Sequence, residues 1–189
     1  MVILVAAAIL VFIVHVRWRV PALSAARRRA ILSGRVSLDS PAGPKGSSAV
    51  AVDWGFPGRA ATLVVFDDDT VILYLYPRAA ILGSTRFRRL EDVVIAGNAL
   101  RGALRGLAHL FAEANDFPLP RPGELTFYLI DPRGTRAAGP AAVREIQGSN
   151  HQLRTAERLA TRLLALVCGT VPAVVPGPLM SLVTEDRPE

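Results

Sequence analysis

The feature that most constrains this chain is an uncharged, apolar run that is followed at once by arginines. Residues 1–16 carry no charged side chain, and the next 19 residues hold six arginines and no acidic residue. These six account for the whole net charge of +6, because the rest of the chain has 16 basic and 16 acidic residues. They are Arg17, Arg19, Arg27, Arg28, Arg29 and Arg35. An apolar run beside a one-signed basic cluster is typical of a membrane anchor.

The length of the run decides whether it can cross a bilayer. The 16 residues would span about 24 Å as a helix, less than the roughly 30 Å of a hydrocarbon core. A helix that continues to Val20 reaches about 30 Å if Arg17 and Arg19 extend toward the headgroups and Trp18 lies at their depth. We therefore predict a transmembrane helix over residues 1–20, which Pro21 ends. A cleaved signal peptide is the alternative.

Orientation follows from the side on which the basic residues lie. Arginines beside a span are retained in the cytoplasm. We therefore expect a periplasmic N-terminus in a bacterial inner membrane and a cytoplasmic location for the rest of the chain. In the basic juxtamembrane segment and linker, residues 21–48, we predict that residues 26–32 lie along the membrane surface. Arg27, Arg28 and Arg29 would each gain about 1 kcal/mol from anionic lipid there. Nucleic-acid binding needs charge spread over a folded face, so we expect no nucleic-acid partner.

Residues 49–169 are predicted to form one cytoplasmic domain of the α+β class. Apolar residues at alternating or helical spacing predict the order β-β-β-α-β-β-α, an antiparallel sheet covered by helices. The predicted strands are residues 49–54, 61–66, 71–76, 124–131 and 136–138; the predicted helices are residues 87–115 and 150–167, and residues 77–85 are predicted as a loop. By element order alone the domain resembles the longin, roadblock and profilin-like group of scaffold domains.

The tail, residues 170–189, is apolar but interrupted by prolines, which exclude a long helix. We expect it either to fold back over the domain or to lie on another protein.

Residues that could carry chemistry are few and scattered. His15, His109 and His151 form no metal-ligand spacing, and Asp67 to Asp69 fit a solvated hairpin turn better than a calcium loop. We predict no catalytic residue, no metal site and no cofactor, and therefore no enzyme. Within the span, His15 could ligate a tetrapyrrole. The alternative is an interfacial histidine close to water.

One loop has the residue types of a recognition surface. Trp54, Phe56 and Arg59 lie around a Gly-Phe-Pro-Gly turn, so they form our candidate interaction loop. The alternative is that these aromatic residues pack on their own sheet.

Several short motifs resemble a family of uncharacterised α+β proteins from GC-rich bacteria. The motifs are Asp53-Trp54-Gly55-Phe56-Pro57, residues 61–64, residues 117–123 and Phe127-Tyr128-Leu129. This resemblance covers about residues 50–165 and implies no known activity or site residue. The relatives appear without the anchor, so the chain looks like a small domain recruited to a membrane.

We therefore expect a non-catalytic accessory subunit that stabilises a multisubunit membrane complex. Its partners would be membrane lipid and the other subunits of that complex. A bacterial photosynthetic reaction-centre or light-harvesting assembly is the interpretation we favour. The alternative is a membrane-tethered regulatory or small-ligand-binding module that uses the candidate interaction loop.

Overall fold

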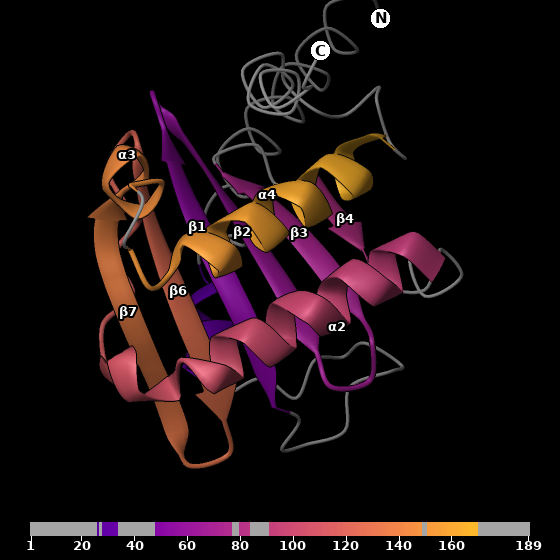
Figure 1. Ribbon diagram of the computed structural model, residues 1–189, viewed down its shortest axis with the longest axis horizontal. Helices are drawn as coiled ribbons and strands as arrows, with labels where there is room; N and C mark the ends of the chain where they lie inside the picture. Colours follow the sequence, from indigo (N-terminus) through magenta and orange to yellow (C-terminus); the bar gives the residue numbers. More distant parts are fainter. Residues whose placement is uncertain are drawn as a thin grey trace, which may run out of the picture.

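The computed structural model describes residue 26, residues 28–33, 48–76, 91–148 and 151–169, and the backbone of residues 80–83. They form one antiparallel sheet with the strand order β4-β3-β2-β1-β6-β7-β5, on which two long helices pack (Figure 1). The strands are β1 (Ala49–Phe56), β2 (Arg59–Phe66), β3 (Val71–Tyr76), β4 (Ala80–Gly83), β5 (Ala112–Glu113), β6 (Glu124–Asp131) and β7 (Gly134–Ala142). The helices are α2 (Glu91–Gly106), the 3₁₀ turn η2 (Ala108–Leu110), α3 (Val143–Ile146) and α4 (Arg154–Gly169).

Strand β1 lies at the centre of the sheet, and its two faces carry different side chains. It pairs with β2 and β6, so that Val52 lies opposite Leu63 and Phe127. Because side chains alternate between the faces of a strand, one face of β1 carries Val50, Val52, Trp54 and Phe56 and the other carries Ala49, Ala51, Asp53 and Gly55. Every residue of β1 is buried, which requires both faces of the sheet to be covered.

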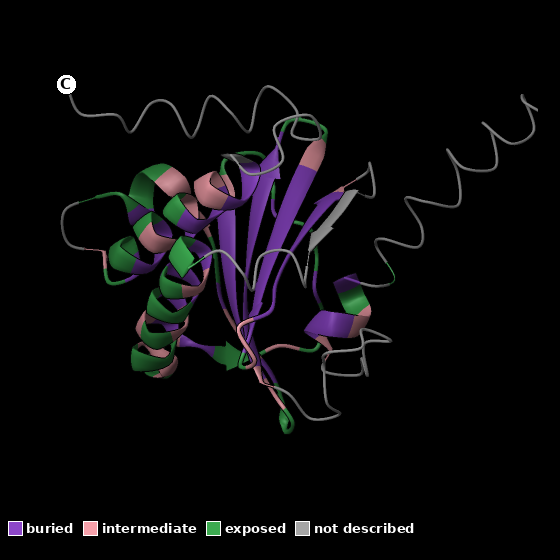
Figure 2. Cartoon of the chain, turned by 90° about the vertical axis from the view of Figure 1, so that its right-hand side faces the viewer, coloured by how far each residue is buried: buried purple, intermediate pink, exposed green. Residues whose placement is uncertain are grey.

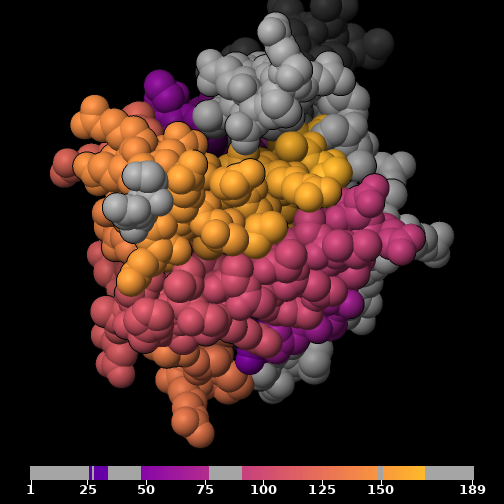
Figure 3. Space-filling model, in the orientation of Figure 1, coloured from indigo at the N-terminus to yellow at the C-terminus, as the bar shows by residue number. Residues whose placement is uncertain are grey.

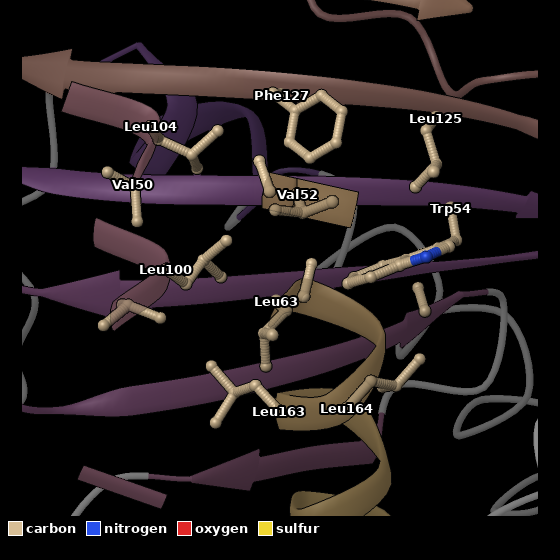
Figure 4. Close-up of a cluster of buried hydrophobic side chains, with 14 of the residues drawn as sticks. Val50, Val52, Trp54, Leu63, Leu100, Leu104, Leu125, Phe127, Leu163 and Leu164 are labelled. Carbon is tan, nitrogen blue, oxygen red and sulfur yellow. The ribbon is translucent and has the colours of Figure 1, made fainter. Parts of the chain in front are cut away.

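The large apolar side chains of β1 point toward α2 and α4 and form the main core. Figure 4 shows Trp54 and Leu63 of the sheet beside Leu164 of α4. At Gly97, α2 approaches β2 closely, since a Cβ there would lie 3.2 Å from Val65 Cγ1. Burying one Val, Leu or Phe side chain contributes about 1.5–3 kcal/mol. The main core holds most of the buried side chains of this kind, so the helix-covered face accounts for most of the hydrophobic stabilisation.

The opposite face of the sheet is covered in part by residues 28–33, which we call the N-terminal helical segment. Its turn is closed by a hydrogen bond from Ser33 N to Arg29 O at 2.9 Å. Ile31 and Leu32 are 4% and 0% exposed and belong to a second apolar cluster with residues of β1, β2, β3 and β6. In Figure 2 the buried sheet lies between α2 and α4 on one side and this segment on the other. The domain therefore includes residues that we had assigned to the juxtamembrane segment and linker.

The predicted α+β class, an antiparallel sheet with packed helices, is confirmed. The finer order was wrong in three places, one of which is that the short helix α3 between β7 and α4 was not predicted. Residues 80–83, predicted as loop, form β4, in which Leu82 pairs with Leu73 of β3. The helix predicted to reach residue 115 ends at Gly106, where glycine disfavours the helix and a hydrogen bond from Leu107 N to Leu104 O tightens the last turn.

The two ends of the chain carry predictions that the structure does not address. Among the described residues, no helix is long and apolar enough to cross a membrane. The predicted span, residues 1–20, and the predicted tail, residues 170–189, lie outside the described residues. Both stay predictions.

Two glycines give opposite predictions for stability. A Cβ at Gly55 would lie 1.9 Å from the carbonyl oxygen of Arg121, so we expect Gly55→Ala to lower the free energy of unfolding by roughly 2–3 kcal/mol. At Gly102 nothing lies within 4 Å of a Cβ, and alanine favours the helix, so Gly102→Ala should raise stability by about 0.5–1 kcal/mol. Urea denaturation of both variants tests this contrast. Equal effects at the two positions would contradict the close approach at Gly55.

Candidate functional site

Arg28 reaches from the N-terminal helical segment into the sheet and binds Asp53. The two residues are 6% and 0% exposed, although both are charged side chains. Arg28 Nη2 donates to Asp53 Oδ2 and forms an ion pair with it, while Nε donates to Thr62 Oγ1 at 3.2 Å. Nη1 donates to Phe117 O at 2.7 Å, and Nη2 also donates to Pro118 O at 3.2 Å. One side chain thus connects the segment, two strands and the loop before β6.

Three neighbouring strands, β2, β1 and β6, carry polar residues side by side at the position that Arg28 contacts. The register places Thr62 and Thr126 on either side of Asp53, and the two threonines are 3% and 6% exposed. Burial raises the pKa of the Tyr128 phenol, and the neighbouring Asp53 carboxylate raises it further. Within the described part of the chain, Asp53 Oδ1 has no hydrogen-bond partner. A buried carboxylate so placed depends on Arg28 for its compensation.

The loop between β5 and β6, residues 114–123, completes the site. Its Phe117 is buried and packs edge-on against Tyr128, with ring centroids 6.0 Å apart. Farther along, the loop crosses β1 at Gly55, whose carbonyl oxygen accepts a hydrogen bond from Gly123 N at 2.9 Å. Because this crossing fixes the loop on the sheet, the two carbonyls that Arg28 binds are held in place. These contacts of Arg28 with Asp53, Thr62 and the carbonyls of Phe117 and Pro118 hold the N-terminal helical segment on the sheet. We call them the Arg28 latch.

The predicted contact of Arg28 with membrane lipid was wrong. Its guanidinium is enclosed by protein groups, because Ile31 and Leu32 turn the same side of the segment toward the sheet. Arg29 is exposed, and its contact with lipid stays a prediction. Arg17, Trp18, Arg19, Arg27 and the possible pigment ligand His15 lie outside the described residues.

The candidate interaction loop was wrong for its two aromatic residues. Trp54 and Phe56 are 4% and 9% exposed and belong to the main core, which is the alternative we had kept. The chain turns directly from β1 into β2 at Gly58, whose φ of +66° suits glycine. Arg59 is half-buried, and no described residue binds its buried Nη1.

Two of the three aspartates of the β2–β3 turn, Asp67 and Asp69, form ion pairs with arginines of α2, whereas Asp68 Oδ1 accepts a hydrogen bond from Thr70 N at 3.0 Å. Arg105 Nη2 lies 2.5 Å from Asp67 Oδ1, and Arg101 Nη2 lies 3.4 Å from Asp69 Oδ1. Arg101 also donates to Phe66 O at 2.5 Å. The turn is therefore a half-exposed anchor for the helix, and such ion pairs contribute at most about 1 kcal/mol each.

Histidines and acids do not gather elsewhere in the described residues, where no group of three or more metal-ligating side chains occurs. His109 is exposed on η2. His151 Nδ1 accepts a hydrogen bond from Leu153 N at 3.1 Å, which places this side chain just before α4. The third, His15, lies outside the described range.

Sequence reasoning missed the Arg28 latch, although two signals for it were present. Asp53 interrupts an apolar strand of Val, Ala and Trp, and a charge at such a position needs a buried partner. Arg28 is followed by Ile31 and Leu32 at a spacing of three and four, which puts the three side chains on one helical face. Together the signals indicate an arginine that faces the protein rather than lipid.

Replacing only one residue of the Arg28–Asp53 pair should lower the free energy of unfolding far more than replacing both. We expect Arg28→Met to lower the free energy of unfolding by about 3–5 kcal/mol, because Asp53 would be buried without compensation. Arg28→Met combined with Asp53→Leu should recover most of that loss. Urea denaturation of the full chain measures both variants, with Arg29→Met as the exposed control. Additive losses in the double variant would contradict a coupled pair.

A second prediction concerns alkaline pH. Cys168 is 0% exposed, and burial raises the pKa of its thiol from 9.0 to about 11. The folded state therefore keeps a proton that the unfolded state loses, so stability is retained below pH 9 and falls as the pH rises toward 11. Each pKa unit corresponds to roughly 1.4 kcal/mol. Urea titrations between pH 8 and 11 should show a steeper fall for the natural chain than for Cys168→Ala. Parallel curves would contradict a buried thiol.

Comparison with known proteins adds no relative to this picture. No protein-family model, curated protein or solved structure matches the chain. The resemblance of the Asp53 to Pro57 motif to proteins of GC-rich bacteria therefore stays a prediction. What the structure supplies instead is a role for the motif's residues in this fold: Asp53 binds Arg28, Trp54 and Phe56 fill the core, and Gly55 admits the loop.

Proposed function

We propose that the chain is a non-catalytic, membrane-anchored accessory subunit that stabilises a multisubunit membrane complex. The observation that supports the proposal is the Arg28 latch. It fixes to the sheet a residue that lies only eight positions beyond Val20, the end of the predicted span. The connection between anchor and domain is therefore short.

The reach of this connection sets how far the domain can stand from the bilayer. Eight residues extend at most about 28 Å, whereas a domain of about 120 residues has a radius of gyration of about 14 Å. The domain would lie next to the membrane, with the face that carries the N-terminal helical segment nearest to it. A fixed position of this kind suits a subunit that braces its neighbours.

The alternative function is weakened, because two of the three residues in its candidate interaction loop are not accessible, and only Arg59 is half-buried. A ligand-binding module was to use Trp54 and Phe56, and both side chains are buried in the core. The choice of a bacterial photosynthetic reaction-centre or light-harvesting assembly rests on the sequence interpretation alone. We keep it as the assembly to examine first. The proposed location of the chain is the bacterial inner membrane, with the domain in the cytoplasm.

The proposal is tested by purifying the full chain through a C-terminal tag from membranes in mild detergent. We expect other membrane subunits to co-purify in a fixed stoichiometry and to be lost when residues 1–20 are deleted. This deletion keeps Arg28 and the latch, so it separates loss of the anchor from loss of the fold. Recovery of the natural chain as a free monomer would overturn the proposal.

A further inference from the structure

The outer surface of α2 and α4 is the face of the domain opposite the N-terminal helical segment. The two helices lie side by side and form a continuous surface (Figure 3). Their inner sides pack on the sheet through Leu100, Leu104, Leu163 and Leu164. If the segment lies toward the membrane, this outer surface is turned toward the cytoplasm.

Helix α4 places a row of arginines on this surface. Arg154, Arg158 and Arg162 follow one another at intervals of four residues and are all exposed, so they lie along one side of the helix. Within the described ranges, none of the three has an ion-pair or hydrogen-bond partner for its guanidinium. The acid of the helix, Glu157, is 4% exposed and binds Gln147 and Thr161 instead. Within the described residues, no acidic side chain therefore pairs with the row.

Helix α2 contributes a shallow, uncharged strip beside the row. Ile95, Ala99, Gly102 and Gly106 recur at intervals of four, three and four residues and are exposed. Ile95 is 58% exposed, and a Cβ at Gly102 or Gly106 would meet nothing within 4 Å. The strip therefore offers one apolar anchor and a backbone that another helix can approach closely.

We propose that this surface docks an acidic amphipathic helix of a partner subunit. Its apolar side would lie on Ile95, Ala99 and Gly102, and its acidic side would pair with Arg158 and Arg162. The inference rests on the proposed function, since it names the surface through which the accessory subunit holds its complex. Complementary charges of this kind set partner choice and register.

Two other occupants fit the observations less well. A second copy of the chain would bring its own Arg154, Arg158 and Arg162 toward the first set, and like charges at an interface cost several kcal/mol. The bilayer is the other negatively charged surface near the domain. With residues 1–20 as the anchor, the eight positions from Val20 to Arg28 would turn the opposite face of the sheet toward it.

The test uses the full chain in its own membranes, with the photo-cross-linker p-benzoylphenylalanine at Arg154, an exposed position at the start of α4, or, as a control site, at Arg133. Arg133 is exposed in the β6–β7 turn, away from α2 and α4. We expect the probe at Arg154 to label one segment of a co-purifying subunit, and that segment to be rich in Asp and Glu. The control site should not label it.

Charge reversal then asks whether the arginines cause the contact. Arg158→Glu with Arg162→Glu should lower the cross-linking yield about tenfold, because each lost pair is replaced by repulsion. Replacing two acids of the labelled segment by lysine should restore the yield. Arg133→Glu is the matched control and should change nothing. Gly102→Leu, which has open space around its Cβ, should block docking without unfolding the helix.

The outcomes separate this inference from the function on which it rests. Cross-links to lipid or to a second copy, or a yield unchanged by charge reversal, overturn the docking surface while the co-purifying complex still stands. The same holds if a partner co-purifies and the probe at Arg154 labels no acidic segment. A natural chain that purifies without any partner subunit overturns both.

Discussion

The buried ion pair between Arg28 and Asp53 is the interaction on which the rest of the domain's second face depends. Removing two charges from water is costly, and their attraction offsets that cost only when the remaining donors are satisfied. Arg28 binds four acceptors from three parts of the chain, whereas Asp53 Oδ1 has no partner among the described residues. Such a pair adds little net stability. Its effect is to specify one position for the N-terminal helical segment, because Arg28 reaches Asp53 only when Ile31 and Leu32 face the sheet and Arg29 stays exposed.

The composition of β1 makes this position possible. On the helix-covered face the strand carries Val50, Val52, Trp54 and Phe56, whereas the other face carries Ala49, Ala51, Asp53 and Gly55. Small side chains let the segment and the loop before β6 lie directly on the sheet, and Gly55 is the limiting case because the loop carbonyl leaves no room for a Cβ. Strand β1 thus packs against α2 and α4 on one face and against the N-terminal helical segment and the loop before β6 on the other.

Much of the helix-covered half could be predicted from the sequence, because its signals are local. The alternation of Leu125, Phe127 and Leu129 predicts β6 with the bounds that the structure has, and the same holds for β3. The short strands β4 and β5 could not be predicted, since a strand of two to four residues forms only against a partner. Arg28 was misread because its neighbours in sequence are arginines, whereas its neighbours in space are Asp53 and Thr62.

The central claim is that residues 28–33 are fixed on the sheet by Arg28 and so tie the domain closely to its predicted anchor. It is tested most directly by a distance measurement between spin labels at Arg29 and Arg133, two exposed positions, in the full chain in lipid nanodiscs. A docked segment gives one narrow distance distribution, which Arg28→Ala broadens and Arg105→Ala leaves unchanged. A broad distribution in the natural chain, or one that Arg28→Ala does not alter, would contradict the claim.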